Sequence, residues 1–132
     1  PITEEGQCIL AVEPRVHTKK TAGIGFPAGY INEGESYLDA AERELLEETG
    51  YRADRLQHLA EFYQDEGCSA AYNYGVLATG CRKVGSQTLD EGEFIRYFLC
   101  DFEDVEELID KKYILGANSQ LIYEKARRLL KK

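Results

Sequence analysis

The sequence lacks any long apolar run, and this absence limits the kind of protein it encodes. No stretch of roughly 18 apolar residues occurs in the chain, so we expect no membrane-spanning helix. The N-terminus shows no charged segment followed by an apolar one of the secretory kind, and we expect a cytoplasmic protein. No repeat, low-complexity tract or Pro/Gly-rich linker divides the chain, so we predict a single domain spanning residues 1–132.

Positive charge is also scarce in this chain. The 16 lysines and arginines are outnumbered by 24 aspartates and glutamates, which gives a formal net charge of -8 at pH 7. Proteins that bind a nucleic-acid backbone usually carry a basic face, so we expect no nucleic acid as a partner. A small phosphate-bearing molecule is compatible with this charge, because bound metal ions reverse the local sign.

The chain has no Cys-x-x-Cys pair among its four cysteines, which are Cys8, Cys68, Cys81 and Cys100. A disulfide or zinc framework is therefore the less favoured interpretation. We expect buried free thiols in a reducing cytoplasm.

Apolar and aromatic patterns predict strands mixed with a few helices. Strands are expected at residues 7–12, 56–63, 71–79 and 94–100. A capping box of Ser36 and Asp39 predicts the start of one helix, and Gly50 predicts its end. Further helices are expected at 104–110 and from about residue 119 onward, the last one burying Leu121, Ile122, Ala126 and Leu129. This mixture predicts a sheet covered by helices on more than one side.

A short basic segment follows the first expected strand. Residues 13–21 contain Arg15, His17, Lys19 and Lys20. Such a run is ordinarily a solvated loop, and it becomes a phosphate-facing loop only if it lies beside an acidic site. Both interpretations stay open at the level of sequence.

Three glutamates form the most informative feature of the chain. Glu44, Glu47 and Glu48 are spaced by three and four residues, so a helix presents all three on one face. Neighbouring like charges repel by roughly a few tenths of a kcal/mol per pair, and a cation would neutralise them. Hard divalent ions such as Mg²⁺ take carboxylate oxygens and share them with substrate phosphates. An ordinary solvated helix face is the alternative for these three residues taken alone.

The surrounding residues resolve that choice, because they resemble the Nudix box, G-x5-E-x7-R-E-U-x-E-E-x-G-U, where U is a bulky aliphatic residue. The matching positions are Gly29, Glu35, Arg43, Glu44, Leu45, Glu47, Glu48 and Gly50. The one departure is Tyr51 at the last aliphatic position. We call Glu44, Glu47 and Glu48 the box glutamates.

The Nudix resemblance implies an α/β/α sandwich with a mixed central sheet. It also implies Mg²⁺, with Mn²⁺ as an alternative, held by the box glutamates and the backbone carbonyl of Ala28. Glu35 and Arg43 are expected to brace the loop and the helix. Gly29 and Arg15 are expected at the substrate.

Several further segments are similar to the ADP-ribose pyrophosphatase branch of Nudix. They are FPAGYINEGES, LLEETGY, FYQDEG, LDEGEFI and KKYILGANSQLIYEKA. In that branch an acidic loop matching residues 90–93 supplies the catalytic base and a metal contact. The resemblance favours Glu91 as the base and Glu93 as metal ligand or base, and a solvated turn is the alternative.

The resemblance thus implies a Mg²⁺-dependent Nudix pyrophosphatase that acts on a nucleotide-derived small molecule, either ADP-ribose or a nucleotide sugar. A nucleoside triphosphate or dinucleoside polyphosphate pyrophosphatase is the alternative within the family. A non-catalytic sensor of a nucleotide metabolite is a third interpretation, less favoured because all box glutamates are present. Relatives of this branch are often dimers, so a homodimer is considered.

Overall fold

The computed structural model describes residues 1–15 and 22–131. His17, Lys19 and Lys20 of the expected basic segment therefore lie outside the described residues. In chain order the elements are β1 (Gln7–Pro14), β2 (Ala22–Gly25), α1 (Tyr37–Thr49), β3 (Tyr51–Arg52), β4 (Arg55–Tyr63), β5 (Tyr72–Thr79), β6 (Arg82–Lys83), β7 (Arg96–Asp101), α2 (Asp104–Asp110) and α3 (Ala117–Leu130). The four expected strands and three expected helices are confirmed, whereas the short strands β2, β3 and β6 were not predicted.

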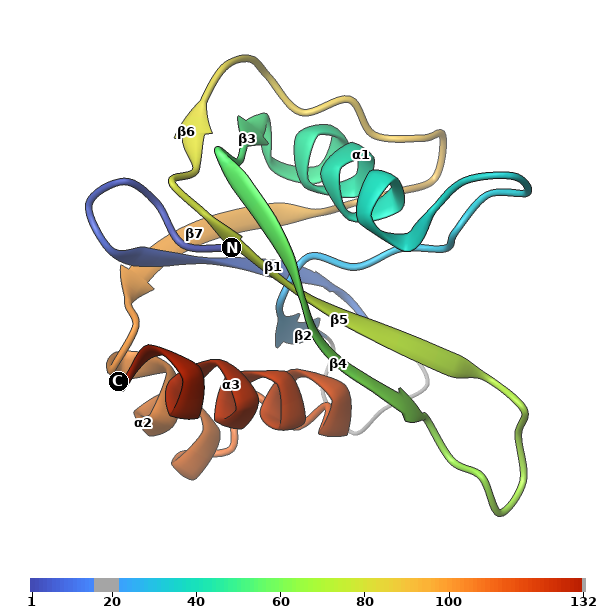
Figure 1. The fold of residues 1–132 in the computed structure, drawn as a ribbon. Helices are drawn as coiled ribbons and strands as arrows, with labels where there is room; N and C mark the ends of the chain where they lie inside the picture. Colours follow the sequence, from blue (N-terminus) through green and yellow to red (C-terminus); the bar gives the residue numbers. More distant parts are fainter. Residues whose placement is uncertain (16–21, 132) are drawn as a thin grey trace.

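Side-chain alternation along β1 explains the layered architecture. Ile9 faces α1 and packs with Leu45, while the neighbouring Cys8 and Leu10 face the opposite side and pack with Tyr123 of α3. Two separate apolar cores result, one on each side of the strand. Figure 1 shows α1 on one side of the strands and α2 with α3 on the other, which confirms the predicted α/β/α sandwich.

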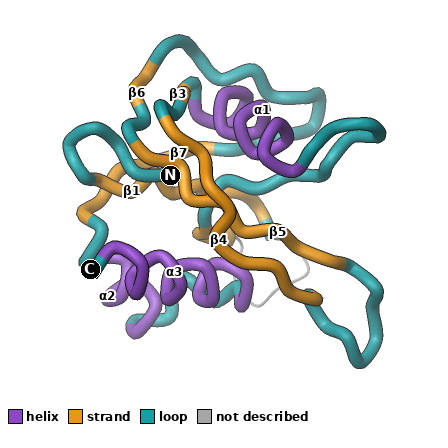
Figure 2. Tube along the Cα trace, in the orientation of Figure 1, coloured by secondary structure: helices purple, strands orange, loops and turns teal. Residues whose placement is uncertain are grey.

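The strands form three small antiparallel groups. β1 lies between β2 and β7, β3 pairs with β6, and β4 pairs with β5 in a long hairpin. An isolated bridge between Thr3 and Cys81 is parallel, so the pairing of extended segments is mixed. Long loops at 26–36 and 84–95 flank α1 on either side, as Figure 2 shows, so they can reach the acidic face of that helix.

Helix α1 begins and ends where its sequence indicates. The Ser36 side chain accepts a hydrogen bond from the backbone N–H of Asp39 at 3.1 Å. Gly50 ends the helix in the left-handed conformation, with φ of 77°, and a Cβ there would overlap the backbone oxygen of Gly85. A glycine is therefore required at this position for two independent reasons.

Two expectations about burial were wrong. Leu121 is 38% exposed, because the inward face of α3 runs through Ser119, Tyr123 and Ala126 and leaves Leu121 between them. Cys68 is exposed on the turn between β4 and β5, where its Sγ donates to Asp65. All four cysteines are free thiols. Within the part of the chain that the structure describes, no helix is both long and apolar enough to span a bilayer.

Candidate functional site

Arg43 is the hydrogen-bonding centre of the site. Its guanidinium donates two hydrogen bonds to Glu35, from Nε at 2.9 Å and from Nη2 at 3.0 Å. The same group donates to the backbone oxygen of Tyr30 at 2.9 Å, to Glu44 at 2.8 Å and to Glu47 at 3.1 Å. These bonds join the loop before α1 to the acidic face of the helix. The two bonds to Glu35, followed by one from the backbone N–H of Asn32, hold the pKa of the Glu35 carboxyl below its ordinary value.

Gly29 and Glu44 lie so close together that any side chain at position 29 would displace the Glu44 carboxyl group. A Cβ built on Gly29 would overlap the carboxyl group of Glu44. Burial raises the pKa of the Glu44 carboxyl, and the hydrogen bond from Arg43 acts in the opposite direction. The missing side chain at Gly29 therefore lets the loop backbone pack directly against a partly desolvated carboxylate.

Glu48 is the buried carboxylate of the site. Only 2% of the residue is exposed, and its Oε2 atom has no hydrogen-bond partner among the described residues. Burial, followed by the negative charges of Glu44, Glu13 and Glu93, raises the pKa of this carboxyl to about 8. A hydrogen bond from the backbone N–H of Ala28 acts in the opposite direction. A buried carboxylate with an unsatisfied oxygen is costly unless a donor or a cation meets it.

The box glutamates share one side of α1, but their carboxylates do not converge on one point. Among the residues that the structure describes, no group of three His, Cys, Asp or Glu side chains is close enough together to hold a metal ion. Glu44 and Glu47 are instead drawn to the guanidinium of Arg43. Their chemistry nonetheless fits a hard divalent cation, because all the donors are carboxylate oxygens and the unpartnered oxygen of Glu48 is among them.

The acidic loop expected at residues 90–93 lies within electrostatic reach of this face. The charge of Glu93 contributes to the raised pKa values of both Glu44 and Glu48. Glu93 is exposed, and its Oε1 accepts a hydrogen bond from the backbone N–H of Asp90 at 2.7 Å. Glu91 is exposed as well. The choice between Glu91 and Glu93 as general base stays a prediction.

The structure adds a carboxylate that the sequence patterns did not single out, that of Glu13 near the end of β1. Its charge raises the pKa of Glu48, and its Oε1 lies 2.5 Å from Nη2 of Arg15. The Arg15 side chain extends over Gly23 of β2, where a Cβ would lie 2.8 Å from Arg15 Cγ. The ion pair with Glu13 thus places Arg15 at the border of the site. The only sequence signal for Glu13 is a charge that closes an apolar strand.

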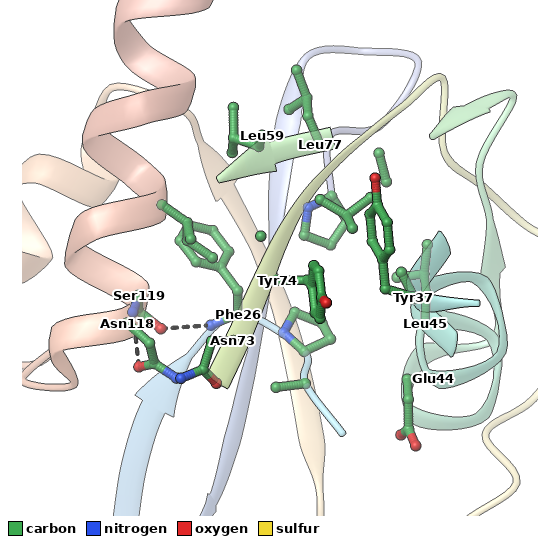
Figure 3. Close-up of a pocket in the computed structure, with 18 of the residues that line it drawn as sticks. Phe26, Tyr37, Glu44, Leu45, Leu59, Asn73, Tyr74, Leu77, Asn118 and Ser119 are labelled. Atoms are coloured by element: carbon green, nitrogen blue, oxygen red, sulfur yellow. Dashed lines mark hydrogen bonds between the residues drawn. The ribbon is translucent and has the colours of Figure 1, made fainter. Parts of the chain in front are cut away.

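A cavity of about 470 Å³ begins beside Glu44 and extends between β5, α1 and α3. Figure 3 shows Glu44 at one end and Asn73 and Asn118 across from it. Tyr37 and Tyr74 also line the cavity, and their rings stack with centres 4.6 Å apart. No lysine or arginine occurs among the described residues that line it. The cavity therefore suits a neutral organic group better than a phosphate.

Known proteins resemble the chain over most of its length. The family model for the NUDIX domain matches residues 1–118. An ADP-ribose pyrophosphatase of Bacillus subtilis (strain 168) is 30% identical over 119 residues, which make up 89% of this chain and 64% of that protein. A methanol dehydrogenase activator of Bacillus methanolicus is 29% identical over 119 residues, with the same two shares. The chain thus spans about 64% of the length of these two relatives.

A solved structure described as an ADP compounds hydrolase has the same fold. It matches with a TM-score of 0.87 and 27% sequence identity, over 99% of this chain and 69% of that one. These matches confirm the predicted resemblance to the ADP-ribose pyrophosphatase branch. The family model extends over far more than the box, to both sides of α1, and the chain therefore belongs to the Nudix hydrolase family.

Proposed function

We propose that this Nudix hydrolase is a Mg²⁺-dependent pyrophosphatase that cleaves the diphosphate bond of a nucleoside diphosphate derivative. The observation that carries the proposal is the carboxylate of Glu48, which is buried beside other acidic side chains and has one unpartnered oxygen among the described residues. A hard cation held there would satisfy that oxygen and neutralise the surrounding negative charge.

The residues divide the chemistry between them. The box glutamates and the backbone carbonyl of Ala28 would hold Mg²⁺, or Mn²⁺ as an alternative. The chemistry that a bound divalent ion supplies is neutralisation of the phosphate charge and a lower pKa for the attacking water. Arg43 and Glu35 fix the loop and the helix relative to each other through their paired hydrogen bonds. Glu91 or Glu93 of the acidic loop accepts the proton of the attacking water.

ADP-ribose or a nucleotide sugar is the substrate that we propose. Such a molecule has a diphosphate for the acidic face and organic groups that suit the largely apolar cavity beside Glu44. The name of the Bacillus subtilis relative, ADP-ribose pyrophosphatase, favours the same class. Arg15, at the border of the site, is the residue that we expect to meet the diphosphate.

A hydrolysis assay with product identification tests the proposal. The panel contains ADP-ribose, nucleotide sugars, dinucleoside polyphosphates and nucleoside triphosphates, each with and without Mg²⁺. AMP and ribose phosphate formed from ADP-ribose support the proposed reaction. If inorganic pyrophosphate forms from a nucleoside triphosphate while ADP-ribose stays intact, the substrate is a nucleoside triphosphate and the proposed substrate class is wrong. Tight binding of ADP-ribose with no turnover under any condition favours a metabolite sensor.

A matched pair of variants tests the site itself. Glu48→Gln removes the charge of the buried carboxylate and should lower kcat by orders of magnitude with the fold retained. Glu42→Gln is the control, because Glu42 lies on the same helix in an exposed ion pair with Arg52. It should keep wild-type turnover. Equal turnover of the Glu48 variant and wild type would refute the metal assignment.

A further inference from the structure

The acidic loop is anchored to the same helix that carries the box glutamates. The last carbonyls of a helix have no partner within the helix and must find one elsewhere. In α1 these partners come from the segment 83–88. The backbone N–H of Thr88 donates to the oxygen of Glu47 at 2.8 Å, and Lys83 Nζ donates to the oxygen of Thr49 at 3.1 Å. The oxygen of Gly50 accepts from two more backbone N–H groups of this segment.

The remaining carbonyl, that of Glu48, is bound by the side chain of Gln87. Its Nε2 donates to the Glu48 oxygen at 2.6 Å and to the backbone oxygen of Ile95 at 2.8 Å. Glu48 lies on α1, and Ile95 is the buried residue with which the chain leaves the acidic loop. One amide group therefore joins the helix, the beginning of the loop and its end.

The two hydrogen bonds of Gln87 hold together the two ends of the loop that contains residues 88–94. Within this loop, residues 90–93 form two further hydrogen bonds. The Glu93 N–H donates to the backbone oxygen of Asp90 at 3.0 Å, and the Asp90 N–H donates to the Glu93 carboxylate. The loop is thus a small closed unit, and Gln87 sets its position relative to the helix.

We propose that Gln87 is a positioning residue of the hydrolytic site, and that its amide holds the acidic loop, with Glu93, against the face of α1 that carries the box glutamates. The inference rests on the proposed function, because a fixed loop matters for rate only if the loop takes part in hydrolysis. The side chain bonds to backbone oxygens and to none of the reacting groups, so it acts through the loop. Gln87 is half-buried, so the loss of either bond would leave a backbone oxygen partly shielded from water.

The variant Gln87→Met tests the inference, because methionine keeps the length of the side chain and loses both donors. The control is Gln120→Met, since Gln120 of α3 also donates from its side-chain amide to a backbone oxygen, that of Ile114 at 3.0 Å. In Gln87→Met we expect kcat to fall by roughly 10- to 100-fold with KM within about threefold. Gln120→Met should keep both constants near wild type.

A measurement independent of turnover checks the anchor itself. Amide hydrogen exchange, followed by NMR without metal or substrate, should speed up at Thr88 and Glu93 in Gln87→Met by about tenfold or more. The control variant should leave these two amides unchanged. Gln87→Asn, whose amide is one methylene too short to reach both oxygens, is the second variant and should change exchange and kcat in the same direction.

The outcomes separate the two proposals. Unchanged exchange at Thr88 and Glu93, or faster exchange with wild-type kcat, overturns the positioning role of Gln87 and leaves the proposed function standing. A raised KM with unchanged kcat also overturns it, because the residue would then serve binding only. A wild-type protein without Mg²⁺-dependent turnover on any substrate of the panel refutes the proposed function and with it this role.

Discussion

Replacing Gly29 with alanine tests whether the loop before α1 must touch the carboxylate of Glu44. The added methyl group would occupy space that the Glu44 carboxyl group fills. Ordinary carbon–carbon contact of about 3.5 Å then requires that carboxylate to retreat by about 1 Å or more. Because misplacing a group by about 1 Å costs roughly 100-fold in rate, we expect kcat/KM to fall by about that factor. This corresponds to about 3 kcal/mol of lost transition-state stabilisation.

The same change should leave the fold nearly intact. Gly29 is exposed and has no positive φ, so alanine causes no backbone strain there. Urea unfolding should therefore give a free energy of unfolding within about 1 kcal/mol of wild type. Calorimetric titration with Mg²⁺ should show weaker binding, because Glu44 is one of the expected ligands. A stable protein with impaired metal binding separates a defect of the site from a defect of folding.

Gly67→Ala is the matched control for this substitution. Gly67 lies on the turn between β4 and β5, and a Cβ there would meet only Asp65 Oδ1, at an ordinary 3.5 Å. This variant should keep wild-type kcat/KM and metal affinity. If Gly29→Ala behaves like Gly67→Ala in both assays, the close approach to Glu44 has no functional consequence and the reasoning is wrong.

Three more predictions concern the charged groups of the site. Because the pKa of Glu48 is raised from 4.5 to about 8, the folded protein keeps a proton that the unfolded chain releases in this window. Without divalent metal, the free energy of unfolding should therefore decrease as pH rises from about 4.5 to about 8, and urea titrations of Glu48→Gln should lose this slope. Arg43→Lys keeps the charge but loses the paired hydrogen bonds to Glu35, and steady-state kinetics should show kcat lower by roughly 10- to 100-fold. Comparing kcat of Glu91→Gln and Glu93→Gln identifies the general base, which is the residue whose loss lowers kcat with KM nearly unchanged.

Local chemistry made the helix of the box predictable from the sequence. The hydroxyl of Ser36 bonds to the N–H of Asp39 within a few residues, and Gly50 adopts the left-handed conformation that a C-terminal glycine supplies. The spacing of the box glutamates likewise fixes their common side of the helix once a helix forms. Features of this kind depend on neighbours within about one helical turn, and sequence patterns describe such neighbours well.

Features that depend on distant segments were not predictable in the same way. Gln87 bonds to an oxygen 39 residues away, and Glu13 acts on Glu48 of α1 from strand β1. The inward face of α3 was misplaced at Leu121, because helical periodicity gives the width of an apolar stripe and the docking of the helix decides its rotation. No sequence pattern marked the short strands β3 and β6, which are held by pairing with each other.

Three acidic residues of the chain lie close enough to Glu48 to act on its charge. Glu13, Glu44 and Glu93 all disfavour the charged form of Glu48, while its buried surroundings do so most strongly. A proton and the proposed divalent cation would therefore compete for the same carboxylate at neutral pH. Metal binding should release protons below about pH 8, and metal affinity should rise with pH until Glu48 is fully ionised. Burying one glutamate under its acidic neighbours thus couples the affinity for the proposed metal directly to pH.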